Sequence, residues 1–189
     1  MSKLNPARAD LLETFALDVP IAQADGFRLV AEDGRQFLDF LSQYGALPFG
    51  HNPRAIWDAV QGFQASGMPT MVQPLRALEA ERLAERLADL APGDLGIVTF
   101  ANSGAEAVEA AIKLARVRTG RDAILATDNG FHGKTLGALS ATGRAQYQRD
   151  FAAPLSGFDH VPYGDVEALE ARLAAAPERF AAFFVEPIQ

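Results

Sequence analysis

The sequence predicts an α/β protein built around a parallel sheet with helices on both faces. After Pro92, short apolar segments that suit buried strands alternate with amphipathic segments that suit helices. Before Pro92, a hairpin signal is followed by a loop rich in Gly, Pro and aromatic residues. The 189 residues are 49% apolar and 22% charged, a composition typical of a chain that folds around a packed core.

The N-terminal part of the chain predicts a hairpin and then a loop. Residues 27–31 and 36–41 flank the dipeptide Asp33-Gly34, which suits the positive φ angles of tight hairpin turns. Residues 44–53 contain glycine, proline and aromatic side chains in no regular period. We therefore expect a loop there.

Three segments divide the chain by their composition. Residues 1–53 hold the hairpin and its loop. Residues 54–74 begin as a helix after Pro53 and end in a stretch broken by glycine and prolines, which indicates a linker or an interface loop. Residues 75–189 hold the alternating strands and helices.

The third segment has a regular order of predicted elements. Few strands follow Pro92, and a doubly wound sheet normally has more, so we expect the chain to stop at Gln189 inside a larger domain. The predicted elements are a helix over 75–90, a strand over 95–101, a helix over 104–118, a strand over 122–127, a short helix over 134–142, a strand over 158–161, a helix capped by Asp165 and a strand over 180–186.

The turn between the strand at 95–101 and the next helix is a candidate phosphate site. A helix N-terminus has unpaired amides and partial positive charge, and Gly104 and Ala105 are small enough to let an anion approach. Ser103 adds a hydroxyl donor. A capping box of Ser103 and Glu106 explains the same residues without any ligand. Both interpretations stay open from the local pattern.

Two further segments follow predicted strands, where α/β proteins hold ligands. Phe131 and His132 could stack on a flat heteroaromatic ring, or they could be a buried Phe and a surface His in a plain turn. Glu186 ends the last strand. Its carboxylate could face the same crevice, or it could lie in solvent.

Other functions are disfavoured by composition and spacing. The net charge of −7 disfavours nucleic acid as a partner, and the absence of cysteine excludes disulfides and thiolate chemistry. His51, His132 and His160 lack metal-ligand spacing, and Asp128 stands where a P-loop needs its first glycine. There is no apolar signal core and no membrane-spanning run, so we expect a cytoplasmic protein without membrane contact.

In this order and spacing, four segments resemble the class III aminotransferases that depend on pyridoxal 5'-phosphate (PLP). That group includes the acetylornithine, ornithine and 4-aminobutyrate aminotransferases. The resemblance covers nearly the whole chain from about Asp25 onward. The segments that carry it are Asp39-Phe40 with Gly50-His51-Asn52-Pro53, residues 100–107 with 112–116, residues 130–135, and residues 185–189.

The resemblance implies an incomplete fold type I PLP-dependent transferase. Residues 1–53 would be the N-terminal segment of the small domain, and residues 75–189 the first part of the large PLP-binding domain. It also implies a homodimer. Tyr44 would line the substrate entrance. The cofactor-binding residues that it implies are Ser103, Gly104 and Ala105 at the phosphate, Phe131 and His132 at the pyridine ring, and Glu186 in the pocket.

The implied activity is transfer of an amino group from an amine or amino acid to a 2-oxo acid. The lysines of the chain are Lys3, Lys113 and Lys134, and none matches the family's Schiff-base lysine. We therefore expect that lysine beyond Gln189, and we expect residues 1–189 alone to be inactive. The alternatives are another class III PLP reaction, such as an aminomutase or a decarboxylase, and a non-catalytic truncated product or partial chain of a longer protein.

Overall fold

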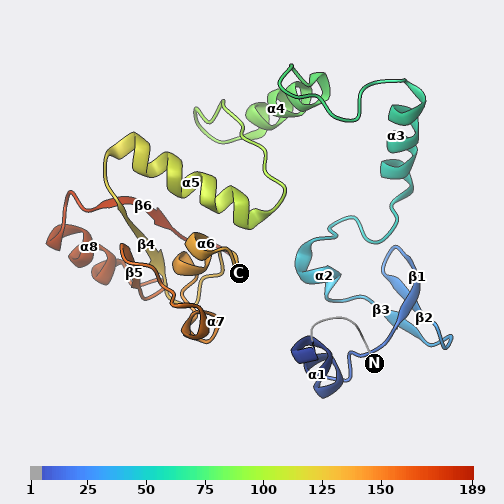
Figure 1. Ribbon diagram of the computed structural model, residues 1–189, viewed down its shortest axis with the longest axis horizontal. Coiled ribbons are helices and arrows are strands. Elements are labelled where there is room, and N and C mark those ends of the chain that lie inside the picture. Colours follow the sequence, from blue (N-terminus) through green and yellow to red (C-terminus); the bar gives the residue numbers. More distant parts are fainter. Residues whose placement is uncertain (1–5) are drawn as a thin grey trace. The chain divides into compact units, whose positions relative to one another are not determined.

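A computed structural model describes residues 6–189, and their side chains from residue 8. The chain divides into two compact units, Met1–Ala77 and Leu78–Gln189. Figure 1 shows both units with their helices and strands labelled.

The first unit is built on a small antiparallel sheet with strand order β1-β2-β3. The hairpin predicted around Asp33-Gly34 is confirmed as β2 and β3, and Gly34 has a φ of 85°. The sequence does not signal α1 or β1, because they lack a clear apolar period; from residue 8 onward their residues are mostly exposed. The elements are α1 (Pro6–Thr14), β1 (Ile21–Asp25), β2 (Arg28–Ala31), β3 (Gln36–Leu38), α2 (Ser42–Gly45) and α3 (Arg54–Ala65).

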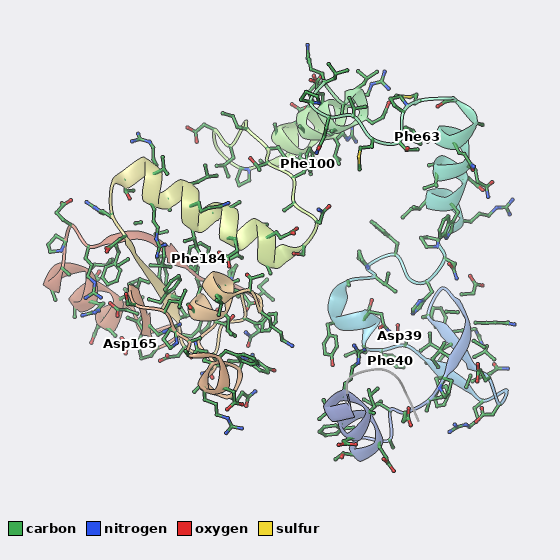
Figure 2. The ribbon with its side chains drawn as sticks, in the orientation of Figure 1. Asp39, Phe40, Phe63, Phe100, Asp165 and Phe184 are labelled. Carbon is green, nitrogen blue, oxygen red and sulfur yellow. The ribbon has the colours of Figure 1, made fainter. Side chains whose placement is uncertain are left out.

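The chain leaves β3 through a turn held by Asp39. Its Oδ1 accepts hydrogen bonds from the amides of Leu41 (3.1 Å) and Ser42 (2.8 Å), and its Oδ2 accepts one from His51 Nε2 (2.9 Å). The hydrogen bond from His51 is the main cause of a pKa below the usual value for Asp39. These bonds end the strand at Leu38, whereas the sequence predicted a strand that continues to residue 41. Asp39 and its neighbour Phe40 are labelled in Figure 2.

The short element α2 is a left-handed turn and not a regular helix. Ser42, Gln43 and Tyr44 have φ angles of 48°, 53° and 60°, a region that non-glycine residues rarely occupy. The loop predicted over 44–53 therefore begins in strained backbone, and the Asp39 carboxylate supplies hydrogen bonds at its start.

The second unit contains the parallel sheet and its helices. The predicted helices are present with boundaries shifted by a few residues, and the short α7 and η1 were not predicted. The elements are α4 (Leu78–Leu90), α5 (Gly104–Thr119), β4 (Ala123–Thr127), α6 (Leu136–Ala141), α7 (Ala145–Gln148), η1 (Arg149–Phe151), β5 (Phe158–Val161), α8 (Val166–Ala175) and β6 (Phe180–Phe184).

The predicted strand over residues 95–101 is wrong. Within residues 6–189 this segment makes no ladder with another strand, and the side chain of Ile97 is 95% exposed. An apolar run becomes a strand only when a neighbouring strand satisfies its amides and carbonyls. The described part of the chain offers no such neighbour to this segment.

The predicted parallel sheet is confirmed, with strand order β5-β4-β6. The central strand β4 pairs in parallel with both others, so that Ile124 lies opposite Phe158 on one side and Ala182 on the other. All residues of β4 are buried. A strand that is buried on both faces reads as a continuous apolar run, which is why the sequence signals β4 so clearly.

Helices cover both faces of this sheet, as predicted. On one face, Ile124 and Ala126 pack with Ile112 of α5 and Ala141 of α6. On the other face lies a second cluster that includes Leu125 of β4 and Leu169 of α8. Alternate residues of one strand thus enter two different cores. Among the helices within residues 6–189, none is long and apolar enough to cross a membrane.

Candidate functional site

The N-terminus of α5 carries the first part of the site. Ser103 is its N-cap, and its Oγ accepts a hydrogen bond from the amide of Glu106 (3.2 Å). In return, Glu106 Oε2 accepts a hydrogen bond from the amide of Asn102 (2.7 Å). Ser103 and Glu106 thus cap the helix start as in a capping box, except that Glu106 accepts from the residue before the N-cap.

The capping box leaves two amides of the first turn free. The amides of Asn102 and Glu106 are hydrogen-bonded within this cap. Those of Gly104 and Ala105 have no hydrogen-bond partner among residues 6–189. A Cβ added to Gly104 would meet no atom within 4 Å. This end of α5 therefore combines two free donors, open space and the positive end of a helix dipole, which together favour an anion.

The loop after β4 lies directly against this turn. A Cβ placed on Gly133 would stand 2.7 Å from the Cβ of Ala105, and Gly133 has a φ of 131°. Both the close approach and the backbone angle favour glycine. The segment 130–135 thus lies beside the free amides of α5.

Phe131 presents its ring at the surface of this loop. The residue is 40% exposed, so it is not the buried core Phe that the alternative interpretation requires. Its ring meets that of Tyr147 edge-to-face, with centroids 6.1 Å apart and planes at 80°. Lys134 Nζ lies 5.4 Å from the centroid of the Tyr147 ring. The contact with Tyr147 orients the Phe131 ring, and part of the residue stays exposed.

His132 is half-buried and is held through its backbone. Its amide donates to Thr142 Oγ1 (2.9 Å), and its ring meets that of Phe184 at 5.8 Å; Phe184 is labelled on β6 in Figure 2. Within the described residues, its buried Nε2 has no hydrogen-bond partner. Burial lowers the pKa of His132, with a further contribution from His160, while the nearby Glu186 carboxylate opposes the shift. The imidazole is therefore neutral at neutral pH.

Glu186 joins the end of the last strand to the same loop. Its Oε2 accepts hydrogen bonds from the amide of Phe131 (2.8 Å) and from Gln189 Nε2 (2.6 Å). Burial alone would raise the pKa of Glu186, but these hydrogen bonds, with His132 and Arg144 nearby, hold it below the ordinary value. Glu186 is thus an ionised carboxylate with fixed donors, and not a strand-terminal acid free in solvent.

Hydrogen bonds around Asn129 support the Glu186 carboxylate. The carbonyl of Asn129 accepts from Gln189 Nε2 and from Arg144 Nε, both at 2.9 Å. Arg144 also donates to Gln189 Oε1 at 2.9 Å. A cavity of about 240 Å³ lies here, at the carboxyl ends of β4 and β6. It is lined by Thr127, Asp128, Asn129, Gly130, Tyr163, Glu186 and Gln189.

The structure thus brings together three of the segments singled out in the sequence: the Ser103–Ala105 turn, Phe131 with His132, and Glu186. Tyr44 belongs to the other unit, where it is 91% exposed in the left-handed turn, and its role at a substrate entrance stays a prediction. Within residues 6–189 no group of three His, Cys, Asp or Glu side chains could hold a metal ion.

The residues that support the site have no signal in the sequence. Gln189 donates to the Glu186 carboxylate, Arg144 donates to Gln189, and Tyr147 contacts Phe131. Glu109 lies four residues before Lys113 on its helix, a spacing that allows an ion pair. Its carboxylate instead accepts hydrogen bonds from the start of α6, and Lys113 adds only an electrostatic contribution. These contacts join residues far apart in sequence, and no local pattern indicates them.

Comparison with known proteins places this arrangement in a family. The sequence model described as aminotransferase class-III matches residues 13–189. The aminotransferase PigE of Serratia sp. (strain ATCC 39006) is 42% identical over 187 residues. That alignment covers 98% of this chain and 22% of PigE, so the chain spans less than a quarter of that relative.

Solved transaminase structures share the fold. An (S)-enantioselective omega-transaminase from Thermomicrobium roseum matches with a TM-score of 0.83 and 28% identity, over 100% of this chain and 47% of its own. The taurine:2-oxoglutarate aminotransferase from Bifidobacterium kashiwanohense, solved with PLP and glutamate, matches with a TM-score of 0.78 and 28% identity, over 97% of this chain and 48% of its own. The chain therefore spans slightly under half of these structures, and it belongs to the class III aminotransferase family.

Proposed function

We propose that a protein containing these residues is a PLP-dependent transaminase that transfers an amino group from an amine or amino acid to a 2-oxo acid. The observation that carries this proposal is the pair of free amides at Gly104 and Ala105, next to a loop that exposes an aromatic ring. Membership of the class III family supports the reaction type.

The residues fit the phosphate of PLP. The amides of Gly104 and Ala105 would donate to it, and the Ser103 hydroxyl can donate its proton while its oxygen accepts from Glu106. The helix dipole adds attraction for the negative charge. Gly104 has no side chain to block the approach.

The loop after β4 and the end of β6 would hold the pyridine ring. Phe131 offers a partly exposed aromatic ring, and His132 beside it is neutral because burial lowers its pKa. The ionised Glu186 carboxylate would lie near the ring and the incoming substrate. When bound, PLP supplies the electron-withdrawing ring that amino transfer needs, and the protein supplies position and electrostatics.

The finer assignments rest on the family resemblance. We propose a homodimer in the cytoplasm, with Tyr44 lining the substrate entrance. No residue of this chain matches the Schiff-base lysine, so we assign amino transfer to the longer protein and expect no activity from residues 1–189 alone.

Substitution of Gly104 tests the phosphate site in the full-length protein. In Gly104→Asp, a carboxylate at the first turn of α5 interacts favourably with the helix dipole, so the substitution should leave folding intact. The same carboxylate would repel the phosphate. We expect PLP affinity to fall tenfold or more, which corresponds to about 1.4 kcal/mol. Equilibrium titration followed by coenzyme absorbance measures this, and formation of glutamate from 2-oxoglutarate with a panel of amino donors measures the transfer.

Gly104→Ala is the matched control, because a methyl group at this position would meet no atom within 4 Å. It should retain PLP affinity close to that of the unmodified protein. Equal PLP affinity in Gly104→Asp and Gly104→Ala would contradict the phosphate site. An unmodified protein that binds PLP but transfers no amino group from any donor would contradict the reaction.

A further inference from the structure

One carboxylate connects the helix that carries the free amides to the loop that carries the aromatic ring. Glu109 lies on α5, and its Oε1 accepts three hydrogen bonds from the start of α6. The donors are Thr135 Oγ1 (2.6 Å), the Gly137 amide (2.9 Å) and the Ala138 amide (3.1 Å). Thr135 is the N-cap of α6, yet its own side chain makes no capping bond. Glu109 caps α6 from another helix.

The negative charge of Glu109 strengthens its hydrogen bonds to the start of α6. Burial alone would raise its pKa, but the hydrogen bonds from Thr135, Ala138 and Gly137, together with the Lys113 ammonium, hold it below the ordinary value. Glu109 is therefore ionised at neutral pH. Hydrogen bonds to an ionised acceptor are about twice as strong as neutral ones.

The packing around Glu109 leaves little freedom. A Cβ on Gly137 would overlap the Glu109 carboxylate, so a side chain at position 137 would force that carboxylate to shift. A second close approach, Gly133 against Ala105, lies at the other end of the same loop. The segment between the two contacts is thus fixed to α5 at both ends.

We propose that Glu109 is a positioning residue, which sets the distance between the amides of Gly104 and Ala105 and the ring of Phe131. The ring and the phosphate of one coenzyme are joined covalently, so both parts of the site must be at the right separation. Glu109 connects the elements that carry them. This inference rests on the proposed function, because the separation matters only if one ligand spans both parts.

The test uses the full-length protein and reads the coenzyme itself. We would measure PLP affinity and the circular dichroism of bound PLP in Glu109→Ala, Glu109→Gln and Thr135→Val. In Glu109→Ala we expect PLP affinity to fall about tenfold, or about 1.4 kcal/mol, with an altered dichroism band per bound coenzyme. Gln keeps an acceptor oxygen, so Glu109→Gln should recover most of the affinity and the band. Thr135→Val removes one donor and should give a smaller change of the same kind.

Glu170→Ala is the control, because Glu170 is an exposed glutamate on α8. Its affinity and dichroism should match those of the unmodified protein. A purely structural role for Glu109 would lower the melting temperature of the apoprotein and leave the band per bound coenzyme unchanged; that result overturns the inference. If Glu109→Ala does not fold, unchanged affinity and band in Thr135→Val overturn it. Failure of the unmodified protein to bind PLP would overturn the proposed function as well.

Discussion

Gly133 lies so close to Ala105 that no other residue fits at position 133. A Cβ there would stand 2.7 Å from the Cβ of Ala105, closer than real Cβ atoms come, and 3.0 Å from the Cβ of Ala138, which is also a tight contact. This contact joins the loop after β4 to the first turn of α5, although 28 positions separate the two residues in sequence.

Replacement of Gly133 by Ala should therefore damage both the fold and the coenzyme site. The left-handed backbone and the clash should together cost about 2–4 kcal/mol of unfolding free energy. The loop would have to move away from α5, so PLP affinity in the full-length protein should fall as well. Urea unfolding of the apoprotein and titration with PLP measure the two effects.

Gly164→Ala is the matched control for Gly133→Ala. Gly164 has a φ of 81° and no atom within 4 Å of an added Cβ, so it has the backbone strain without the clash. We expect a loss of about 1–2 kcal/mol and unchanged PLP affinity. Equal effects of the two substitutions on PLP affinity would refute the role assigned to the contact with Ala105.

Phe131 and Phe158 should respond oppositely to truncation. Phe158 is 7% exposed in the core around Ile124, and Phe158→Ala should cost about 3–5 kcal/mol of stability. Phe131 is 40% exposed and has one edge-to-face partner, so Phe131→Ala should cost only about 1–2 kcal/mol. Its main effect should be weaker PLP binding and a shifted coenzyme absorbance. A large stability loss with an unaltered spectrum would make Phe131 a core residue.

Asp39 should hold the left-handed turn that follows β3. In Asp39→Asn the charge is lost and the contact to His51 weakens, so the amides of Leu41 and Ser42 should exchange with solvent faster. Hydrogen exchange measured by mass spectrometry on residues 39–47 would report this. Asp33→Asn is the control, because Asp33 is exposed and its partner among the described residues is Arg35. Equal exchange in the two variants would count against the role of Asp39.

Asp39 should also make the stability of the fold depend on pH. The pKa of Asp39 in the folded protein lies below its ordinary value of 3.8, chiefly because of the His51 hydrogen bond. A depressed carboxyl pKa stabilises the fold above that ordinary value, and the contribution is lost as pH falls through the folded value. In Asp39→Asn this contribution is absent, so stability should decline less steeply with acid in that window. Melting temperatures from pH 7 down to about 3 would measure the difference.

The sequence determined the elements whose signals are local. Ser103 and Gly120 mark the two ends of α5, since the first caps the N-terminus and the second has the left-handed conformation that ends a helix. Asp165 caps α8 through the amide of Ala168 at 2.8 Å, as expected. The buried run of β4 was also readable, because a strand covered on both faces is apolar at every position.

Tertiary structure alone decided which residues meet. The apolar run at 95–101 forms no strand among the described residues, because a strand depends on a neighbour that the run itself cannot specify. Glu109 lies four residues before Lys113, a spacing that allows an ion pair on one helix, but its carboxylate accepts hydrogen bonds from the start of α6. Helical spacing gives neighbours on one helix and cannot give neighbours on another. Likewise, the sequence alone marked Glu186 and Phe131 as candidate site residues, but it did not indicate that they are in contact. Their contact at 2.8 Å exists because the ends of parallel strands β4 and β6 lie side by side in the folded sheet.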